Sequence, residues 1–172
     1  MKKYRWLFGM VLFSLFSAAP AFAEKASWDH VANVKDAADR LAKLHRVEGS
    51  KGVLKFLDAC YRTHLLASTY TAGLESCMAQ DYMHTQVLAQ IYARLPPEER
   101  AKSGAPSPEL IAQGMGQRFM VAFSQYKVSG AEAEAFKKNV DTHGLPIFLK
   151  AVFPKSNNSD AAPGADAEKK KN

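Results

Sequence analysis

The residues that could do chemistry in this sequence gather between Asp58 and His84. The chain's only two cysteines, Cys60 and Cys77, lie there with sixteen residues between them. His64 follows Cys60 by four positions, and His84 follows Cys77 by seven. Such a set is open to three kinds of chemistry: a structural disulfide, a metal site, or a dithiol that does redox work.

A disulfide between the two cysteines is the interpretation that the sequence favours. Their midpoint falls in "ASTYTAG", where small polar and β-branched residues weaken helix formation and Gly73 offers a break. A chain reversal near Ser68 would place the cysteines at the same height on facing helices. One continuous helix would hold them about 25 Å apart, at 1.5 Å rise per residue, and would prevent bonding. The disulfide Cys60–Cys77 and the turn are therefore predicted together.

The metal and dithiol alternatives fit the spacing less well. Cys60 with His64, and Cys77 with Asp81, have the i, i+4 spacing of ligands on one helix face. In an antiparallel hairpin, however, His64 would lie toward the turn and His84 away from it, so a closed four-ligand zinc site is not expected. A catalytic dithiol usually has closely spaced cysteines, and a gap of sixteen residues gives it little support without excluding it. We therefore predict no metal, no cofactor and no catalytic residue.

The first 23 residues predict a cleaved signal peptide. Three basic residues precede a short apolar run, 7–16, and Ala21 and Ala23 supply the small residues that a signal peptidase requires. Cleavage after Ala23 would leave Glu24 first, and glutamate cannot carry a lipid anchor. We therefore expect a periplasmic protein with no membrane span after cleavage. Export to an oxidising compartment also favours the disulfide.

The charge pattern argues against a nucleic-acid partner. Without the three cations of the signal peptide, the formal charge of +6 falls to about +3. The remaining cations are spread singly among acidic residues, and no basic stripe contains the interleaved aromatic residues that nucleic-acid binding would need.

The rest of the chain predicts one domain, at residues 24–154, followed by a tail. The tail, 155–172, has no large apolar residue and is rich in small polar ones, so it is expected to be disordered. Apolar residues in the domain recur every three to four positions, and no strand-like alternation is present. The sequence therefore predicts an all-α fold, a small bundle of about five helices with a disulfide-linked antiparallel helix hairpin.

Capping residues predict where the helices begin and end. Ser27, Ser107 and Ser129 are candidate N-caps, the last in a capping box. Gly49 and Gly144 are candidate helix ends, with Gly144 expected in the left-handed conformation. The helix that follows Ser107 is apolar over much of its circumference and is expected to be the most buried one.

A second candidate site surrounds Gly114 and Gly116 in that same helix. Each glycine costs roughly 1 kcal/mol relative to alanine in a helix interior, so a compensating role is expected. Close helix packing is one explanation, and room for a bound ligand is the other. The candidate ligand or interaction residues are His64, Tyr82, Tyr92, Gly114, Met115, Gly116 and Phe119.

The functional expectation is binding rather than catalysis. The sequence contains no zinc-protease, haem-attachment, nucleophile-elbow or phosphate-loop motif. We expect a non-catalytic interaction or accessory module with another envelope protein as partner. The alternatives are a small-ligand-binding bundle and, less favoured, a thiol- or histidine-dependent enzyme. The enzyme would need a cleft where at least two of Cys60, His64, Asp81 and His84 converge.

Overall fold

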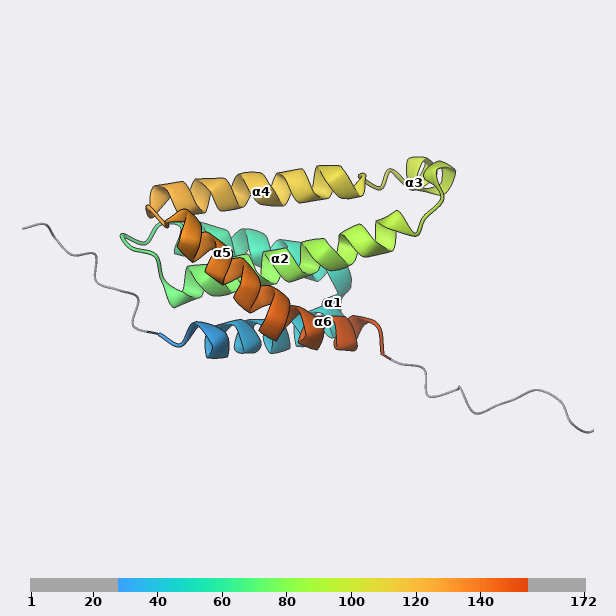
Figure 1. Ribbon diagram of the computed structural model, residues 1–172. Helices are drawn as coiled ribbons and strands as arrows, with labels where there is room; N and C mark the ends of the chain where they lie inside the picture. Colours follow the sequence, from blue (N-terminus) through green and yellow to red (C-terminus); the bar gives the residue numbers. More distant parts are fainter. Residues whose placement is uncertain (1–27, 155–172) are drawn as a thin grey trace, which may run out of the picture.

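The computed structural model describes residues 28–154, and helices are the only regular elements over that range (Figure 1). In chain order they are α1 (His30–His64), α2 (Ala72–Ala93), α3 (Pro97–Ser103), α4 (Pro108–Gln125), α5 (Gly130–Asn139), a π-helical segment (Val140–Gly144) and α6 (Leu145–Val152). The predicted all-α class is confirmed. The predicted signal peptide and polar tail lie outside the described residues. Within residues 28–154, no helix is both long and apolar enough to cross a membrane.

α1 consists of two helical segments that meet at Gly49. This glycine has φ 64° and ψ −169°, a conformation that side chains disfavour. The predicted helix end at Gly49 is therefore a kink inside a longer element. The kink turns the second half of α1 into the partner of α2 in the hairpin.

The start of α1 is fixed by a cap and by a contact with α2. Asp29 is the N-cap, and its Oδ1 accepts hydrogen bonds from the backbone N–H of Val31 and of the next residue, at 2.9 and 3.0 Å. The predicted cap at Ser27 lies outside the described residues, and Asp29 holds that role. Buried Glu75 of α2 accepts a hydrogen bond from Trp28 Nε1, and its Oε2 lies 2.7 Å from His30 Nδ1.

The predicted hairpin and its disulfide are confirmed. α1 ends at His64, α2 begins at Ala72, and the chain reverses between them. Cys60 and Cys77 are bonded, with their Cα atoms 5.8 Å apart. Thr71 caps α2 by accepting from the backbone N–H of Leu74. Residues 67–71 of "ASTYTAG" thus lie where the chain turns, whereas Gly73, expected as a break, is the second residue of α2.

α2, and not α4, is the most buried helix. Every residue from Leu74 to Thr85 is buried, whereas Ala122 is the only buried residue of α4. α2 is covered by α1, by α4 and by the segment that leads into α6 (Figure 1). α4 packs on α2 through one face and leaves Leu110, Met120 and Val121 exposed. The prediction for α4 was wrong because apolar content does not reveal which faces of a helix its neighbours cover.

The predicted left-handed cap at Gly144 was also wrong. Gly144 has φ −99°, and the chain continues from α5 through the π-helical segment into α6 without a break. A Cβ atom at this position would lie 2.9 Å from both Met83 Sδ and Val34 Cγ1. The glycine is therefore explained by its close approach to α1 and α2. The N-caps Ser107 and Ser129 are confirmed.

Candidate functional site

Two cavities open beside the α1–α2 hairpin. The first, which we call the apolar groove, has a volume of about 450 Å³. Its lining comes from the second half of α1 and the residue after it, from α4, and from one residue of α2: Leu54, Leu57, Asp58, Tyr61, Leu65, Gln117, Arg118, Val121 and Asp81. The second, which we call the disulfide cavity, has a volume of about 260 Å³ and lies beside Cys60 and His64.

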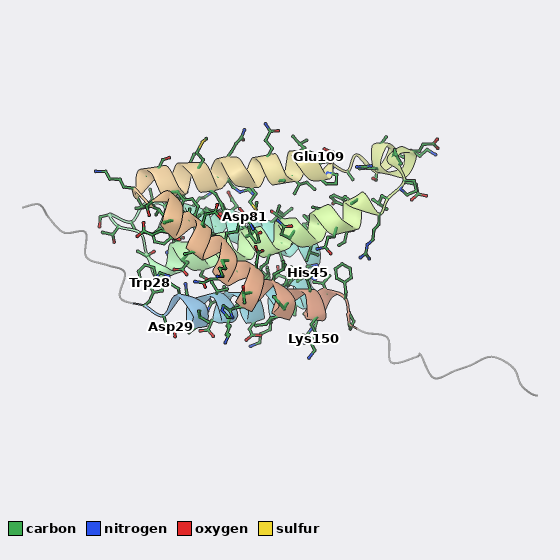
Figure 2. All side chains as sticks on the ribbon, viewed as in Figure 1. Trp28, Asp29, His45, Asp81, Glu109 and Lys150 are labelled. Atoms are coloured by element: carbon green, nitrogen blue, oxygen red, sulfur yellow. A yellow bond between two sulfur atoms is a disulfide. The ribbon has the colours of Figure 1, made fainter. Side chains whose placement is uncertain are left out.

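The apolar groove has in its lining an ion pair between buried Asp81 and partly exposed Arg118. Arg118 reaches from α4 and donates two hydrogen bonds, from Nε and Nη2, to the two carboxylate oxygens of Asp81, both at 2.7 Å. Tyr61 Oη donates to Asp81 Oδ2 at 2.9 Å, and Thr85 Oγ1 donates to Oδ1 at 3.4 Å. Figure 2 shows Asp81 between α2 and α4. A buried carboxylate is tolerated only when it is paired in this way.

The electrostatics of this network keep the groove neutral overall. The hydrogen bonds with Asp81 raise the pKa of the Arg118 guanidinium. Burial, and then the charge of Asp81, raise the pKa of Tyr61, so its hydroxyl stays protonated and donates. The charge of Arg118 is cancelled by Asp81, and the side chain is 46% exposed. The groove therefore suits an apolar occupant that carries a polar group, rather than a strongly charged one.

The disulfide cavity is polar by comparison. Arg40 Nη2 donates to Ser76 Oγ at 2.7 Å, and Asn33 Nδ2 donates to the Ala72 carbonyl at 2.9 Å. These four residues belong to the lining, together with Phe56, Cys60, His64, Gly73 and Gln80.

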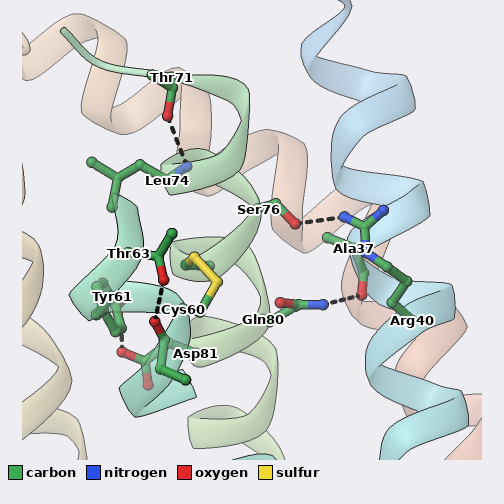
Figure 3. The surroundings of a disulfide bond; sticks show 12 residues. Ala37, Arg40, Cys60, Tyr61, Thr63, Thr71, Leu74, Ser76, Gln80 and Asp81 are labelled. Carbon is green, nitrogen blue, oxygen red and sulfur yellow. Dashed lines mark hydrogen bonds between the residues drawn. A yellow bond between two sulfur atoms is a disulfide. The ribbon is translucent and has the colours of Figure 1, made fainter. Parts of the chain in front are cut away.

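Gln80 and His64 bring unused polar atoms to this cavity. Gln80 Nε2 donates to the Ala37 carbonyl at 3.1 Å, while Gln80 Oε1 is buried and has no hydrogen-bond partner in the described part of the chain. Figure 3 shows the oxygen end of Gln80 on the side of the disulfide and the nitrogen end on the side of Ala37. The two cysteine sulfurs and one ring nitrogen of His64 lie within 4.8 Å of one another.

His84 lies in neither cavity. It is buried, its ring is 6.5 Å from that of His45, and its Nε2 has no hydrogen-bond partner among residues 28–154. Burial, and then the proximity of His45, lower its pKa to about 4. His84 is therefore a neutral core residue at pH 7. Among the four residues considered for an enzyme, the structure brings Cys60 and His64 together, but Cys60 is bonded to Cys77.

The residues predicted as a ligand or interaction site do not gather in one place. His64 lines the disulfide cavity, and the other six line neither cavity. Tyr82 is a core residue whose ring stacks on Phe119 at 6.4 Å, and Met115 packs partly buried against the same core. Tyr92 is half-buried on α2.

Gly114 and Gly116 do not serve close helix packing. A Cβ atom at Gly116 would meet nothing within 4 Å, and one at Gly114 would meet only Arg118 Nη1, at 3.6 Å. Either glycine could therefore carry a side chain without a clash. Gly114 lies beside the guanidinium that pairs with Asp81.

Sequence reasoning missed Arg118, Tyr61 and Gln80. One signal for Arg118 was available, because it is the only cation in the apolar sequence of α4, "PELIAQGMGQRFMVAFSQ". A lone cation in such a helix indicates a partner carboxylate, and Asp81 lies in an apolar stretch of α2. Nothing in the sequence pattern marks Gln80.

Comparison with known proteins adds no family to this description. The chain matched no protein-family model, no curated protein and no solved structure. The two cavities and their chemistry are therefore the basis for a functional proposal.

Proposed function

We propose that this protein is an exported, non-catalytic binding module of the bacterial envelope, whose apolar groove holds an amphipathic helix of another envelope protein. Export rests on the signal-peptide pattern and predicts a mature chain that starts at Glu24. The observation that carries the binding proposal is the apolar groove itself. The partner is a protein rather than a nucleic acid, because the cations of the domain are spread singly among acidic residues.

The wall that α1 contributes is an apolar stripe with exposed Leu54 at one end, and its middle residues, Leu57 and Tyr61, also belong to the core. Leu54, Leu57, Tyr61 and Leu65 are spaced by three, four and four residues, so they form one stripe along the helix. The stripe covers about three turns, or about 16 Å at 1.5 Å rise per residue. An amphipathic partner helix of about three turns would match this length and would place its own apolar stripe against the groove.

The groove also exposes apolar surface on both walls. Leu54 of α1 is 56% exposed and Val121 of α4 is 55% exposed. Covering such side chains would contribute roughly 25 cal/mol per Å² of apolar area removed from water. Apolar walls around a neutral polar group are typical of binding surfaces.

The polar groups of the apolar groove determine which chemical groups the partner should carry. The rim residue Asp58 is paired with Arg62 at 2.8 Å, and both side chains are well exposed. The guanidinium of Arg118 has both Nε and Nη2 occupied by Asp81, which leaves Nη1 to donate. We expect a hydroxyl, an amide or a backbone carbonyl of the partner opposite Arg118. A partner carboxylate there would compete with Asp81.

A non-catalytic role is consistent with how the reactive side chains are used. The disulfide removes both thiols from nucleophilic chemistry. Asp81 accepts hydrogen bonds from three side chains, so it is not poised to take a proton from a substrate.

A small apolar ligand is the second candidate for the groove. Its volume of about 450 Å³ falls within the roughly 300–1,000 Å³ typical of ligand pockets. Such a ligand would also meet apolar walls and the Arg118 Nη1 donor.

A pull-down with two neighbouring variants distinguishes these proposals. Val121 lines the groove, and Met120 is 63% exposed on the same helix without lining it, so Val121→Glu and Met120→Glu form a matched pair. The mature protein and both variants are used as bait in an envelope extract. We expect one partner with the mature protein and with Met120→Glu, and its loss with Val121→Glu.

Two other results would contradict the protein-partner proposal. Equal recovery with both variants would place binding outside the groove. A small molecule that co-purifies with the mature protein and is lost in Val121→Glu, without any protein partner, would favour the second candidate. N-terminal sequencing of the exported protein tests the cleavage site separately.

A further inference from the structure

The disulfide cavity has the donor atoms of a metal site. Cys60 Sγ, Cys77 Sγ and a ring nitrogen of His64 lie within 4.8 Å of one another. In a tetrahedral zinc site, with Zn–S bonds near 2.3 Å and Zn–N bonds near 2.0 Å, ligand atoms lie about 3.4–3.8 Å apart. Once the S–S bond is broken, small rotations of the two cysteines on Cα atoms 5.8 Å apart would bring the three donors to this spacing.

A glycine leaves room for the His64 ring at the site. A Cβ atom at Gly73 would lie 2.9 Å from His64 Nε2 and even closer to Nδ1 and Cε1. The ring therefore lies directly against Gly73 of α2, where only a glycine leaves room, one helical turn before Cys77. Neither ring nitrogen has a hydrogen-bond partner in the part of the chain that the structure describes. The imidazole is thus positioned and free to coordinate.

Gln80 supplies a second, independent indication of a ligand. Its side chain is 1% exposed, and Oε1 has no partner among residues 28–154, although a buried amide oxygen normally accepts a hydrogen bond. Its Nε2 is held by the Ala37 carbonyl, which fixes the oxygen on the side of the disulfide (Figure 3). A zinc-bound water would donate to this oxygen and satisfy it.

The cation in the lining of the cavity, Arg40, is compatible with two thiolates that bind a dication. Arg40 lines the same cavity and is anchored by its hydrogen bond to Ser76. A nearby guanidinium favours the thiolate form of a cysteine. Two thiolates neutralise one Zn²⁺, so the loaded site adds no net charge next to Arg40.

We propose that the reduced protein binds one Zn²⁺ through Cys60, Cys77 and His64, with a water in the fourth position hydrogen-bonded to Gln80. A site with three protein ligands and a water does not need His84, whose distance from His64 had argued against a closed four-ligand site. The disulfide and the zinc site are then alternative states of the same cavity. Neither depends on what occupies the apolar groove.

Conversion of the disulfide state to the zinc state requires two electrons, and a dithiol can supply them as the reductant. One thiolate of the dithiol attacks a cysteine sulfur and breaks the S–S bond, forming a mixed disulfide. That attack releases the partner cysteine as a thiolate. The second thiol of the reductant then attacks the reductant sulfur of the mixed disulfide and displaces the cysteine that was attacked first, so the reductant leaves as a disulfide. Two electrons and two protons pass to Cys60 and Cys77. Zn²⁺ then replaces the two thiol protons, which are released to solvent.

The test is a zinc titration of the mature full-length chain. The protein is reduced with a phosphine, which does not compete as a thiol ligand, and zinc is titrated against a chromophoric chelator. We expect one zinc per chain in the reduced protein and none in the oxidised protein. Cobalt should give thiolate-to-metal charge-transfer bands in the reduced protein only. Circular dichroism follows the fold throughout.

Three variants sharpen the titration. His64→Ala should weaken zinc binding on the order of 100-fold, since loss of even a supporting contact costs 10–100-fold. His143→Ala, which removes a histidine outside the cavity, should bind as the wild type does. Gly73→Ala should keep the disulfide but displace the His64 ring and weaken zinc binding about 10-fold.

Several outcomes would overturn the proposal. One is a reduced protein that does not bind one zinc per chain. Another is a His64→Ala variant that binds zinc as tightly as His143→Ala does. If the reduced chain loses helicity, one equivalent of zinc must restore it, and failure to do so would also overturn the proposal.

Discussion

The apolar groove and the disulfide cavity lie beside the same hairpin but differ in how their polar atoms are used. Cys60 and Tyr61 are neighbours in α1, and Gln80 and Asp81 are neighbours in α2, yet each pair is divided between the two cavities. In the groove, both carboxylate oxygens of Asp81 accept hydrogen bonds. In the disulfide cavity, Gln80 Oε1 accepts none within the described residues.

The polar atoms of the groove are used within the fold, whereas some of those in the disulfide cavity are left for a ligand. Successive residues of a helix point about 100° apart, so one helix can serve two unlike sites. The satisfied charges of the groove link α4 to α2, and the apolar surface beside them is the proposed binding site for a partner. The unsatisfied oxygen and the free imidazole of the other cavity indicate a place for an ion.

The largest expected effect comes from breaking the satisfied network. Arg118→Ala would leave Asp81 buried without its cation, which typically costs 3–5 kcal/mol. Because Arg118 is 46% exposed, water can partly replace it, and we expect a loss of about 2 to 3 kcal/mol in the free energy of unfolding. Urea denaturation measures this loss.

A surface ion pair provides the control for that experiment. Arg62 pairs with Asp58 at 2.8 Å, but both side chains are exposed, so Arg62→Ala should change stability by about 0.5 kcal/mol or less. Equal losses in the free energy of unfolding for Arg62→Ala and Arg118→Ala would show that the Asp81 network stabilises the fold no more than a surface ion pair does.

Acid should destabilise the fold through His84, which lies in neither cavity. Its pKa is about 4 in the folded protein, below the ordinary value of 6.5, so the unfolded chain binds more protons between these values. Stability is therefore full above pH 6.5 and falls as the pH drops toward 4. We expect a loss of about 2 kcal/mol between pH 7 and pH 5, where 1.36 kcal/mol corresponds to one pKa unit.

A substitution at His84 isolates this contribution. His84→Gln removes the titrating group, so it should flatten the dependence of urea midpoints on pH over that range. An unchanged slope in His84→Gln would contradict the assignment to His84.

The smallest effect is expected at Gln80. Gln80→Met keeps the length of the side chain, loses the hydrogen bond to the Ala37 carbonyl and removes the unsatisfied oxygen. These changes oppose each other, so we expect a difference of about 0.5 kcal/mol or less in the free energy of unfolding. If Gln80→Met lost as much free energy of unfolding as Arg118→Ala, the contacts of Gln80 would stabilise the fold as much as those of Asp81 do.

The fold was largely predictable because its signals are local. Apolar periodicity, the caps Ser107 and Ser129, and the weak helix formers between Cys60 and Cys77 each act within a few residues. Burial was less predictable, since the apolar sequence of α4 does not show that only one face is covered. Gly144 was misread because a close approach to Met83, rather than a turn, requires the glycine.

The candidate site was predictable only in part. His64 was identified from its spacing to Cys60, which is a property of one helix. The pairing of Arg118 with Asp81 joins residues 37 positions apart, and sequence gives no measure of that distance. Gly114 and Gly116 drew attention as helix-interior glycines, but Gly116 faces open space and Gly114 faces Arg118 of its own helix, so neither approaches a neighbouring helix.

The central claim, that the apolar groove holds a partner helix, is tested most directly by crosslinking in cells. A photo-reactive amino acid is placed at position 121 inside the groove or at position 120 outside it, and the exported protein is irradiated. The account predicts a crosslink to one envelope protein from position 121 and none from position 120. Crosslinks from position 120 alone, or equally from both positions, would contradict it.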